Sequence, residues 1–401
     1  MQNIKIKTLI DQGTTILDPN SVFIDPSVNL DLISPDITIY PGCRISGEKT
    51  SIGPSCILGE EAPATIKDCQ LAENVKLKGG FFSGATFMSG AELCSGAHVR
   101  PGTLLEEQAS CAHTVGLKQT VLLPFVTLGS LINFCDCLMS GGTDKKNHSE
   151  VGSSYIHFNY TPHQDKATPS LIGDVPRGVM MKEKPIFLGG QGGLVGPCRV
   201  AYGTIVAAGT ILRKDVCEEG CLVHDRPARK HSQHPYNSSI HGNIHRILIN
   251  NFVYIGNLHA LLQWHTSVRS QFMTKTPYLK ACAEGAVNQI KLMIKERVKR
   301  LSQLKNNLEK SLEFIRSKSG ADLSVSPYTE QQAFIEKWPE LESRLETDNA
   351  TNADIKAQDT FLNKLNSNMS YIEAIKALDP DAKQSGTTWL QSIVDSVTAL
   401  I

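Results

Sequence analysis

Apolar residues recur every six positions along the first part of the chain. Within each six, an apolar residue is followed by a small or polar residue, two turn residues often including Gly or Pro, a small or β-branched residue, and a variable one. Clear repeats begin at Ile39, Leu93, Val99 and Leu105, and later at Leu188, Leu194, Val200 and Val206. A repeat at fixed spacing outweighs local propensity when a fold is assigned. The pattern therefore predicts short strands joined by turns.

Three such repeats make one coil of about 18 residues in a triangular parallel β-helix, whose coils stack about 4.8 Å apart. The apolar residues point inward, while Gly, Asn and Asp occupy corners with positive φ. One coil cannot bury its own apolar face, so the fold is stable only as a stack with covered ends. Departures from the repeat predict loops at 60–70, 138–150 and 160–186, of which the last is long and polar enough to carry function.

Helical periodicity replaces the six-residue repeat after residue 240. Apolar residues occupy every sector of 244–264, which is typical of a buried helix. From 287 to 315 they keep three- and four-residue spacing, which predicts one long amphipathic helix or a coiled coil. Its basic residues, including Arg297 and Arg300, are expected on a solvated face, with anion contact as the alternative. Further helices are predicted in 328–346, 352–377 and 387–400.

Glycine and cysteine counts mark the same change. Of the 31 glycines, 26 precede residue 241, and so do 10 of the 11 cysteines. The segment 224–243 is rich in polar and turn-forming residues, as is typical of a connector. We therefore expect an all-β parallel β-helix domain over 1–226, a linker over 227–243 and an α-helical domain over 244–401.

Charge and hydropathy exclude several classes of protein. Forty Lys and Arg residues balance forty Asp and Glu residues, so any anion site must be local and nucleic acid is not an expected partner. No stretch of 18 apolar residues occurs, and the first 13 residues lack the apolar run of a secretion signal. We therefore expect a cytoplasmic protein without a membrane span. Its odd number of cysteines is expected to stay reduced.

Metal and hydrolase motifs are weak in this sequence. The pairs Cys135-x-Cys137 and Cys217-x3-Cys221 lack the C-x2-C spacing common in zinc sites. A histidine tract surrounds the connector, with Asp225 as its only carboxylate; it contains His224, His231, His234, His241 and His245. No G-x-S-x-G element that would carry a hydrolase serine is present. We expect neither a metal centre nor a Ser-His-Asp hydrolase.

Six blocks of the repeat region resemble a known family. They lie at 13–30, 37–43, 98–105, 159–174, 186–197 and 204–216. In content and order they resemble the left-handed β-helix domain of the bifunctional UDP-N-acetylglucosamine pyrophosphorylase / glucosamine-1-phosphate acetyltransferase. The resemblance implies an LpxA-like left-handed parallel β-helix trimer that transfers an acetyl group from acetyl-CoA to the amino group of a sugar phosphate, in sites between subunits. The family's uridylyltransferase domain has no counterpart in the sequence, so pyrophosphorylase activity is not expected.

Matching positions imply a site for the sugar phosphate. Arg100 stands where the family has a phosphate-binding arginine, and Lys118 stands at the position of a matching lysine. One coil separates them, so both side chains are expected on one face in successive layers, where two cations can clamp one phosphate. The alternative is a pair of solvated surface cations. Lys166 lies close to a family lysine that contacts the sugar nucleotide.

Other matches imply a site for the acyl donor. The pair Asn159-Tyr160 matches the family's Asn-Tyr pair near the donor, Gly190 replaces a serine, and Ala207 or Ala208 retains an alanine. Arg226 lies where the family has an arginine suited to the phosphates of coenzyme A, although it is equally well explained as an ordinary cation at a domain boundary. Acetyl-CoA, or another acyl-CoA, is the expected donor.

The family's general base has no counterpart at its own position. That base is a histidine 12 residues beyond the lysine, and ungapped counting from Lys118 reaches Ser130, with Asn133 in place of a tyrosine. A serine hydroxyl cannot take a proton from an ammonium near neutral pH as imidazole does. The family mechanism therefore does not carry over intact.

Three other histidines are candidate bases: His148, His157 and His163. His157 alternates with Tyr155 and Asn159 along its strand, so one outward face shared by all three is expected. His163 is expected to be oriented by Asp165. For each histidine alone, a surface or hydrogen-bonded structural role is the alternative.

Together these patterns predict a homotrimer that binds a sugar phosphate or nucleotide sugar and acts as an acyl-CoA-dependent acyltransferase. A non-catalytic nucleotide-sugar sensor or scaffold is the alternative, because Ser130 replaces the family's base. A transferase with a different donor is the third possibility.

Overall fold

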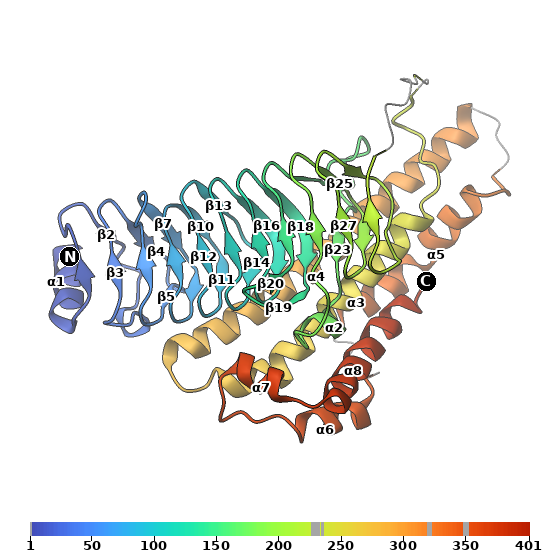
Figure 1. Cartoon of the computed structure of the whole chain (residues 1–401). Coiled ribbons are helices and arrows are strands. Elements are labelled where there is room, and N and C mark those ends of the chain that lie inside the picture. The colour runs from blue at the N-terminus through green and yellow to red at the C-terminus, as the bar shows by residue number, and fades with distance from the viewer. Residues whose placement is uncertain (1, 226–232, 234–235, 319–322, 348–352) are drawn as a thin grey trace.

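The computed structural model describes residues 2–225, 233, 236–318, 323–347 and 353–401. Its first part is a parallel β-solenoid, and its second part is a set of helices that packs along one side of the solenoid (Figure 1). The predicted fold class, a parallel β-helix of six-residue repeats followed by an α-helical region, is confirmed. The expected boundaries at 226 and 243 stay a prediction.

One sheet takes a single strand from each of 11 coils. All its pairings are parallel, with registers such as Leu93 opposite Cys111. In spatial order it contains β1 (Thr15–Ile16), β3 (Thr38–Ile39), β6 (Ile57–Leu58), β9 (Lys76–Leu77), β12 (Glu92–Leu93), β15 (Ser110–Cys111), β17 (Thr127–Leu128), β21 (Glu150–Val151), β24 (Phe187–Leu188), β27 (Ile205–Val206) and β29 (Leu222–Val223).

The second sheet contains the strands of the two other sides of the coils. These two sides form one sheet because the long strands β16 and β18 continue through the corner between them. It contains β2 (Phe23–Ile24), β4 (Arg44–Ser46), β5 (Ser51–Ile52), β7 (Ala64–Lys67), β8 (Gln70–Leu71), β10 (Gly80–Ser83), β11 (Ala85–Phe87), β13 (Ala97–Val99), β14 (Thr103–Leu105), β16 (Gly116–Leu122), β18 (Asn133–Met139), β22 (Ile156–Phe158), β23 (Ser170–Ile172), β25 (Gly193–Val195), β26 (Cys198–Val200) and β28 (Ile211–Leu212). A separate hairpin pairs β19 (Gly142–Asp144) with β20 (Asn147–His148).

The apolar position of each six-residue repeat points into the solenoid, as predicted. Leu188, Leu194, Val200 and Val206 are at most 2% exposed. The corners use glycine with positive φ, as at Gly42, but also residues that the composition did not predict, such as Phe125 at φ 71°. Each inward residue stacks on its partners in the coils above and below, so the core is one continuous column.

Short helices and loops interrupt or cover the solenoid. The helix α1 (Gln2–Gln12) buries Ile6 and Leu9 against the first coil, although no helix was predicted there. A 3-10 turn, η1 (Leu30–Leu32), follows β2. The predicted loop at 60–70 is mostly the strands β7 and β8, whereas 138–150 forms the β19–β20 hairpin and 160–186 carries β23 and α2 (Val175–Gly178). No described helix is long and apolar enough to cross a membrane, and all 11 cysteines are free.

The helical region follows the predicted order. It contains α3 (His245–Ser267), η2 (Arg269–Phe272), α4 (Pro277–Lys318), α5 (Tyr328–Glu346), α6 (Ile355–Leu362), α7 (Tyr371–Ala377) and α8 (Pro380–Thr398). The long amphipathic helix expected over 287–315 is confirmed as α4, while the helix expected over 352–377 is divided into α6 and α7.

The helices and the solenoid share a second apolar core. Leu104 and Val121, on the outer side of the coils, pack in one cluster with Leu258 of α3 and Ile290 of α4. Polar contacts fix the register, since the Gly102 amide donates to Gln289 Oε1 at 2.9 Å. This packing places α4 along the coils and brings its side chains to the polar residues of the second sheet (Figure 1).

Candidate functional site

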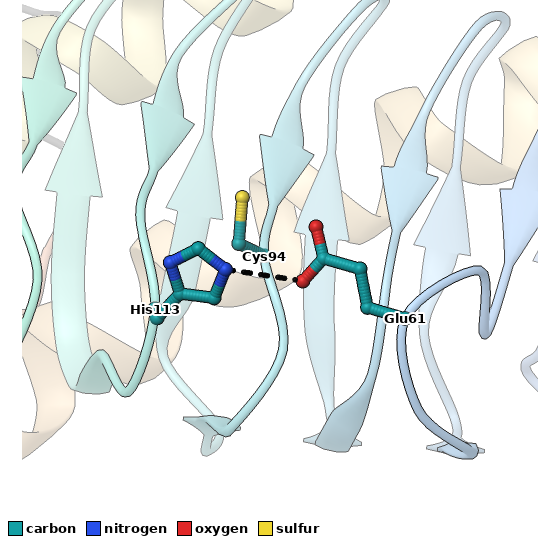
Figure 2. A group of neighbouring side chains, drawn as sticks. All are labelled: Glu61, Cys94 and His113. Atoms are coloured by element: carbon teal, nitrogen blue, oxygen red, sulfur yellow. Dashed lines mark ion pairs between the residues drawn. The ribbon is translucent and has the colours of Figure 1, made fainter.

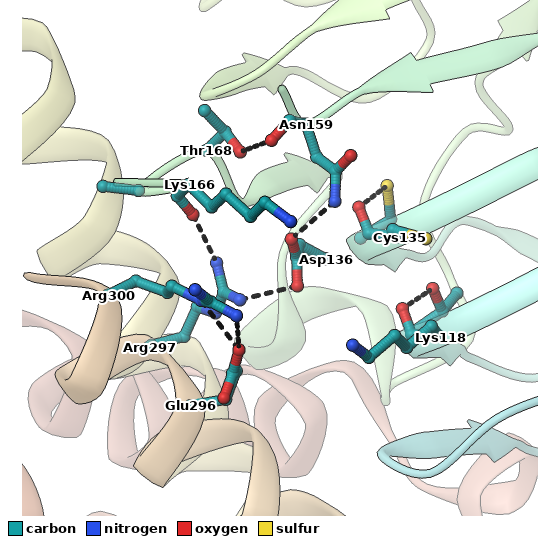
Figure 3. Close-up of polar contacts among 12 residues, drawn as sticks. Lys118, Cys135, Asp136, Asn159, Lys166, Thr168, Glu296, Arg297 and Arg300 are labelled. Atoms are coloured by element: carbon teal, nitrogen blue, oxygen red, sulfur yellow. Dashed lines mark hydrogen bonds and ion pairs between the residues drawn. The ribbon is translucent and has the colours of Figure 1, made fainter. Parts of the chain in front are cut away.

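A buried ion pair joins α4 to the solenoid. Arg297 is 1% exposed, Asp136 of β18 is 6% exposed, and Arg297 Nη2 donates to Asp136 Oδ1 at 2.6 Å (Figure 3). The other oxygen, Oδ2, accepts from Asn159 Nδ2 at 3.2 Å. Asp136 has φ 63°, a left-handed conformation that Asp tolerates better than most residues. The expectation that Arg297 lies on a solvated face is therefore wrong, because α4 packs on the solenoid at this point.

Arg300 of α4 and Lys166 of the loop after β22 lie next to this ion pair. Arg300 Nε donates to Glu296 Oε1 at 2.7 Å, within the same helix. Arg297 Nη1 donates to the Lys166 carbonyl at 3.4 Å. Figure 3 shows the Lys166 side chain extending toward Asp136 and Asn159. The helix and the loop thus enclose Asp136 with cations.

Arg100 and Lys118 lie on one face in successive coils, as predicted. The Arg100 amide donates to the Leu117 carbonyl at 2.9 Å, and Lys118 is the register partner of Cys135 in the next coil. Arg100 Nη2 lies 3.5 Å from Cys135 Sγ. Burial raises the pKa of the Cys135 thiol, and the charges of Arg100 and Lys118 partly oppose that rise, which places both cations near the sulfur.

Three cations of this cluster have no carboxylate partner among the residues that the structure describes. No ion pair within the described part of the chain joins Arg100, Lys118 or Lys166 to an acidic side chain. Arg100 Nε is buried without a hydrogen-bond partner in the same part. Uncompensated cations around a partly buried point attract an anion. We call this set, Arg100, Lys118, Lys166, Asp136 and Arg297, the basic cluster.

His163 lines a second pocket, of about 440 Å³, which also contains Lys310 and Phe314 of α4. Its ring stacks on His241, with 3.8 Å between centroids, and its Nδ1 lies 3.0 Å from the Ser238 carbonyl. Burial, followed by the neighbouring His241, lowers the pKa of His163.

Asp165 does not orient His163, contrary to expectation. Its Oδ1 accepts from the Ala167 amide and from Thr161 Oγ1, and its Oδ2 lies 3.8 Å from His241 Nε2. The carboxylate therefore faces His241, the second histidine of the stack.

The expectation that His157 lies on an outward face with Tyr155 and Asn159 is wrong. His157 is 2% exposed and Tyr155 is fully buried, whereas Ile156 and Phe158 point outward at 41% and 40% exposure. Both ring nitrogens of His157 are occupied, Nδ1 by the Cys135 carbonyl and Nε2 by Ser170 Oγ at 2.8 Å. Burial lowers the pKa of His157 to about 4. His157 is a core residue of β22.

His148 and Ser130 lie apart from the contacts of the basic cluster. His148 is in the β19–β20 hairpin, where Nδ1 lies 2.8 Å from the Lys145 carbonyl and Nε2 lies 3.9 Å from Glu150. The Ser130 amide donates to Ser153 Oγ at 3.1 Å, at a corner between β17 and β18.

The residues expected near the acyl donor are only partly brought together. Asn159 contacts the basic cluster, while the next residue, Tyr160, is 68% exposed. Gly190 and Ala208 stack at one corner, where the Gly209 amide donates to the Gly190 carbonyl at 2.9 Å. Arg226 lies outside the described residues.

The sequence analysis did not predict Asp136 and Arg297 in the basic cluster, or His241 in the His163 pocket. A signal for Asp136 was present, because it lies 18 residues, the predicted length of one coil, beyond Lys118. No local signal marked Arg297, since its partner is 161 residues away in the chain.

Comparisons with known proteins found relatives that match about half of the chain. No protein-family model matches the chain. The bifunctional protein GlmU of Trichlorobacter lovleyi is 29% identical over 227 residues, which are 56% of this chain and 44% of that protein. GlmU of Thermotoga maritima is 27% identical over 213 residues, 53% of this chain and 42% of that protein. The chain spans less than half the length of these relatives, and the resemblance stated from the sequence is confirmed over the repeat region.

Solved structures with similarity to the chain include two acyltransferases. LpxA from Acinetobacter baumannii has a TM-score of 0.32 and 16% identity, and covers 68% of this chain and 96% of its own. The UDP-N-acetylglucosamine O-acyltransferase LpxA from Moraxella catarrhalis has a TM-score of 0.23 and 14% identity, with the same coverage.

Proposed function

We propose that this protein is an acyl-CoA-dependent acyltransferase that acts on a sugar phosphate or nucleotide sugar bound at the basic cluster. The observation that carries the proposal is that three cations without a carboxylate partner among the described residues gather around Cys135 and the buried pair Asp136–Arg297; they are Arg100, Lys118 and Lys166. A phosphate fits such a place because its oxygens accept several charge-assisted hydrogen bonds at once. The similarity to GlmU supports acyl transfer as the reaction.

The catalytic base in this proposal is His163, whose loop contacts α4 at Asn307, about 15 Å along the helix from Arg297, so the bound ligand extends from the basic cluster to the His163 pocket. Its Nδ1 faces a carbonyl and therefore carries the proton, which leaves Nε2 as the acceptor. Because its pKa is lowered, the imidazole is neutral near pH 7 and takes a proton from the sugar's ammonium group. The freed amine attacks the thioester carbonyl, the N–C bond forms, the C–S bond breaks, and the coenzyme A thiolate leaves and takes up a proton. His157 has no free nitrogen for this task.

The acyl donor in this proposal extends from Asn159 and Tyr160 toward the corner formed by Gly190 and Ala208. Gly190 has no room for a side chain, because an added Cβ would lie 2.7 Å from the Ser153 carbonyl oxygen. The missing side chain of Gly190 therefore lets the neighbouring coil at Ser153 pack closely at this corner. The expectation for Arg226 at the phosphates of coenzyme A stays a prediction.

The first test is calorimetric binding of UDP-N-acetylglucosamine, glucosamine-1-phosphate and acetyl-CoA, each alone and then in pairs, followed by mass-spectrometric detection of the acetylated sugar. R100M and K118M are expected to weaken binding of the phosphate ligand by at least about tenfold, since hydrogen bonds to charged groups contribute about 1.5–3 kcal/mol. If both variants bind the phosphate ligand as tightly as the wild type, the proposed site is contradicted.

Lys67 provides a matched control for this test. It is exposed and precedes Arg100 at the same register position, with Ser83 between them in the intervening coil. K67M removes a cation from the same face of the solenoid and is expected to leave affinity unchanged. Equal losses in K67M and R100M would indicate a diffuse surface charge instead of a site.

The second candidate function is a non-catalytic sensor of nucleotide sugar. Ser130 stands where the related acetyltransferases have their base, and its amide is used in a corner contact. Binding of the sugar without binding of acetyl-CoA, and without product, would favour the sensor over the transferase.

A homotrimer is part of the proposal. Phe187, Ile205 and Leu222 stack outward in three consecutive coils at 40%, 50% and 67% exposure. An apolar ladder of this kind on a sheet marks a surface that another chain covers. Light scattering is expected to give three times the chain mass of 43.8 kDa, and I205E is expected to lower it, whereas L17E, which changes a 55% exposed leucine of the first coils, leaves it unchanged.

A further inference from the structure

Three metal-binding side chains gather at a second place on the solenoid, at the end of the first sheet's strands. Cys94 directly follows β12, His113 lies in the segment after β15, and Glu61 lies between β6 and β7 (Figure 2). The basic cluster, by contrast, belongs to the second sheet and α4. The sequence did not point to this place, because its residues lie in different coils and have no motif spacing.

The ligand atoms already lie close together. One ring nitrogen of His113, Cys94 Sγ and a carboxylate oxygen of Glu61 are within 4.8 Å of one another. His113 Nε2 is 3.3 Å from Glu61 Oε2, which also accepts from the Ser95 amide at 2.9 Å. Figure 2 shows the Glu61 carboxylate directed toward the His113 ring, with Cys94 between them. A small movement of these side chains brings all three to coordination distance of one ion.

The solenoid holds the backbone of this group rigidly. The Cys94 amide donates to the Cys111 carbonyl at 3.0 Å, and the His113 carbonyl accepts from the Leu131 amide at 3.0 Å. Parallel pairing above and below each residue limits backbone movement, so the three side chains keep their relative positions. Metal sites need ligands held in this way by a rigid scaffold.

We propose that Glu61, Cys94 and His113 bind a zinc ion. A thiolate, an imidazole and a carboxylate are the three ligand types that Zn²⁺ accepts, and three protein ligands leave one tetrahedral position for water or another group. Each of the three residues is partly or fully accessible to solvent, so the ion can enter without local unfolding.

The charges around the group agree with a divalent ion. Lys78 Nζ lies 2.7 Å from Glu92 Oε1 and 3.7 Å from Glu61 Oε1. With the ion bound, the two carboxylates and the Cys94 thiolate balance the zinc ion and the Lys78 ammonium. Lys78 keeps its shorter contact to Glu92, so Glu61 is free to turn toward the metal.

The test is titration of the reduced, metal-free chain with Co²⁺, followed by displacement with Zn²⁺. We expect one Co²⁺ per chain, with thiolate-to-cobalt absorption in the near ultraviolet and d–d bands of tetrahedral intensity, both removed by Zn²⁺. C94S is expected to abolish the thiolate band, and H113A is expected to weaken binding at least about tenfold, since even the loss of a residue that only orients a metal ligand costs about 10–100-fold in affinity. Circular dichroism of each apo variant checks that the fold is retained.

The double variant C217S/C221S is the matched control. Cys217 and Cys221 line another surface hollow together with His224, and they are the most accessible alternative thiols. The proposal is overturned if the thiolate band is absent, if it persists in C94S, or if it is lost in C217S/C221S. The readout is independent of acyl transfer, so neither result bears on the basic cluster.

Discussion

His157 and His163 lie six residues apart, yet their surroundings give them different chemistry. His157 points into the solenoid, and both of its nitrogens are engaged. His163 lines a pocket and has its Nε2 free of hydrogen bonds within the described residues. A base must present an unprotonated nitrogen to its substrate, so only His163 of this pair is suited to proton transfer.

The first prediction concerns the proposed base. H163Q is expected to lower kcat by about 10²–10⁴-fold, because it removes the proton acceptor, and to leave the affinity for the sugar phosphate unchanged. In the wild type, kcat/KM is expected to rise with pH through an inflection below the ordinary histidine value of 6.5, since burial and His241 lower the pKa of His163. Steady-state assays over a range of pH measure both effects.

H148Q is the control for this prediction, because His148 lies in the β19–β20 hairpin. Its pH profile is expected to match that of the wild type. An inflection that survives in H163Q would contradict the assignment.

The second prediction concerns stability and His157. Its pKa is about 4 in the folded chain and about 6.5 when unfolded, so between these values the unfolded chain binds more protons. The stabilising contribution is therefore present above pH 6.5 and is lost as pH falls toward 4, by about 3 kcal/mol in total. Urea unfolding between pH 4 and pH 7 measures this loss.

H157N, whose amide still donates to the Cys135 carbonyl, is expected to be less stable at pH 7 and to show a shallower pH dependence. If the free energy of unfolding depends on pH equally in H157N and in the wild type, His157 is not the source of the pH dependence.

At the scale of elements, a buried polar contact fixes α3 and η2 on the solenoid. Glu106 and Glu107 follow β14 and are 0% and 7% exposed. Glu106 Oε1 lies 2.7 Å from His265 Nε2 of α3, and Glu107 Oε1 accepts from Arg269 of η2. The Arg269 guanidinium also lies 3.7 Å from the centre of the Tyr371 ring of α7. Three helical elements are thereby joined to one coil.

The third prediction follows from this contact. R269M is expected to lower the free energy of unfolding by about 3–5 kcal/mol, because it leaves Glu107 buried without its partner. The double variant E107Q/R269M is expected to lose less, since neither charge remains unpaired. The loss in R269M is also expected to shrink at acidic pH, where a proton neutralises Glu107.

The partly exposed pair Lys305–Glu309 of α4 is the comparison for this prediction. K305M is expected to change the free energy of unfolding by less than about 1 kcal/mol. Chemical unfolding of the wild type and of these three variants measures these differences. A double variant as unstable as R269M alone would show that packing, not charge, holds η2.

Periodicity predicted the strands and long helices because burial imposes the same spacing throughout each element. It failed for His157, which pairs with Leu194 in the inward ladder. The two positions are not separated by a multiple of six, because the long segment 160–186 lies between them. Counting in sixes across this segment therefore no longer tells which positions face inward. Alternation along one short strand does not tell it either, because it leaves both faces possible. The pairing of Asp136 with Arg297 was beyond prediction for a related reason, since it depends on how α4 docks.

At the scale of the whole molecule, the solenoid and the helices depend on each other. The coils present Met88, Leu104 and Val121 on their outer side, and the helices cover these residues. A solenoid without the helices would expose this apolar surface to water, and the helices would lose their main packing partner. The chain is therefore expected to behave as one cooperative unit, although its two parts differ in local architecture.

The fourth prediction tests this cooperativity by hydrogen exchange at increasing urea concentration. Amides of β14, β16 and α4 are expected to lose protection together, because their side chains share one core. L104A removes solenoid atoms from that core and is expected to cost about 2–5 kcal/mol, seen equally in the strand amides and in α4. The helix α1 covers the far end of the solenoid and serves as the internal reference, with earlier loss of protection. If α4 opened at urea concentrations where β14 and β16 stay protected, the helices would form a separate folding unit. The basic cluster, which needs Arg297 from α4, would then exist only in the fraction of molecules whose helices are docked.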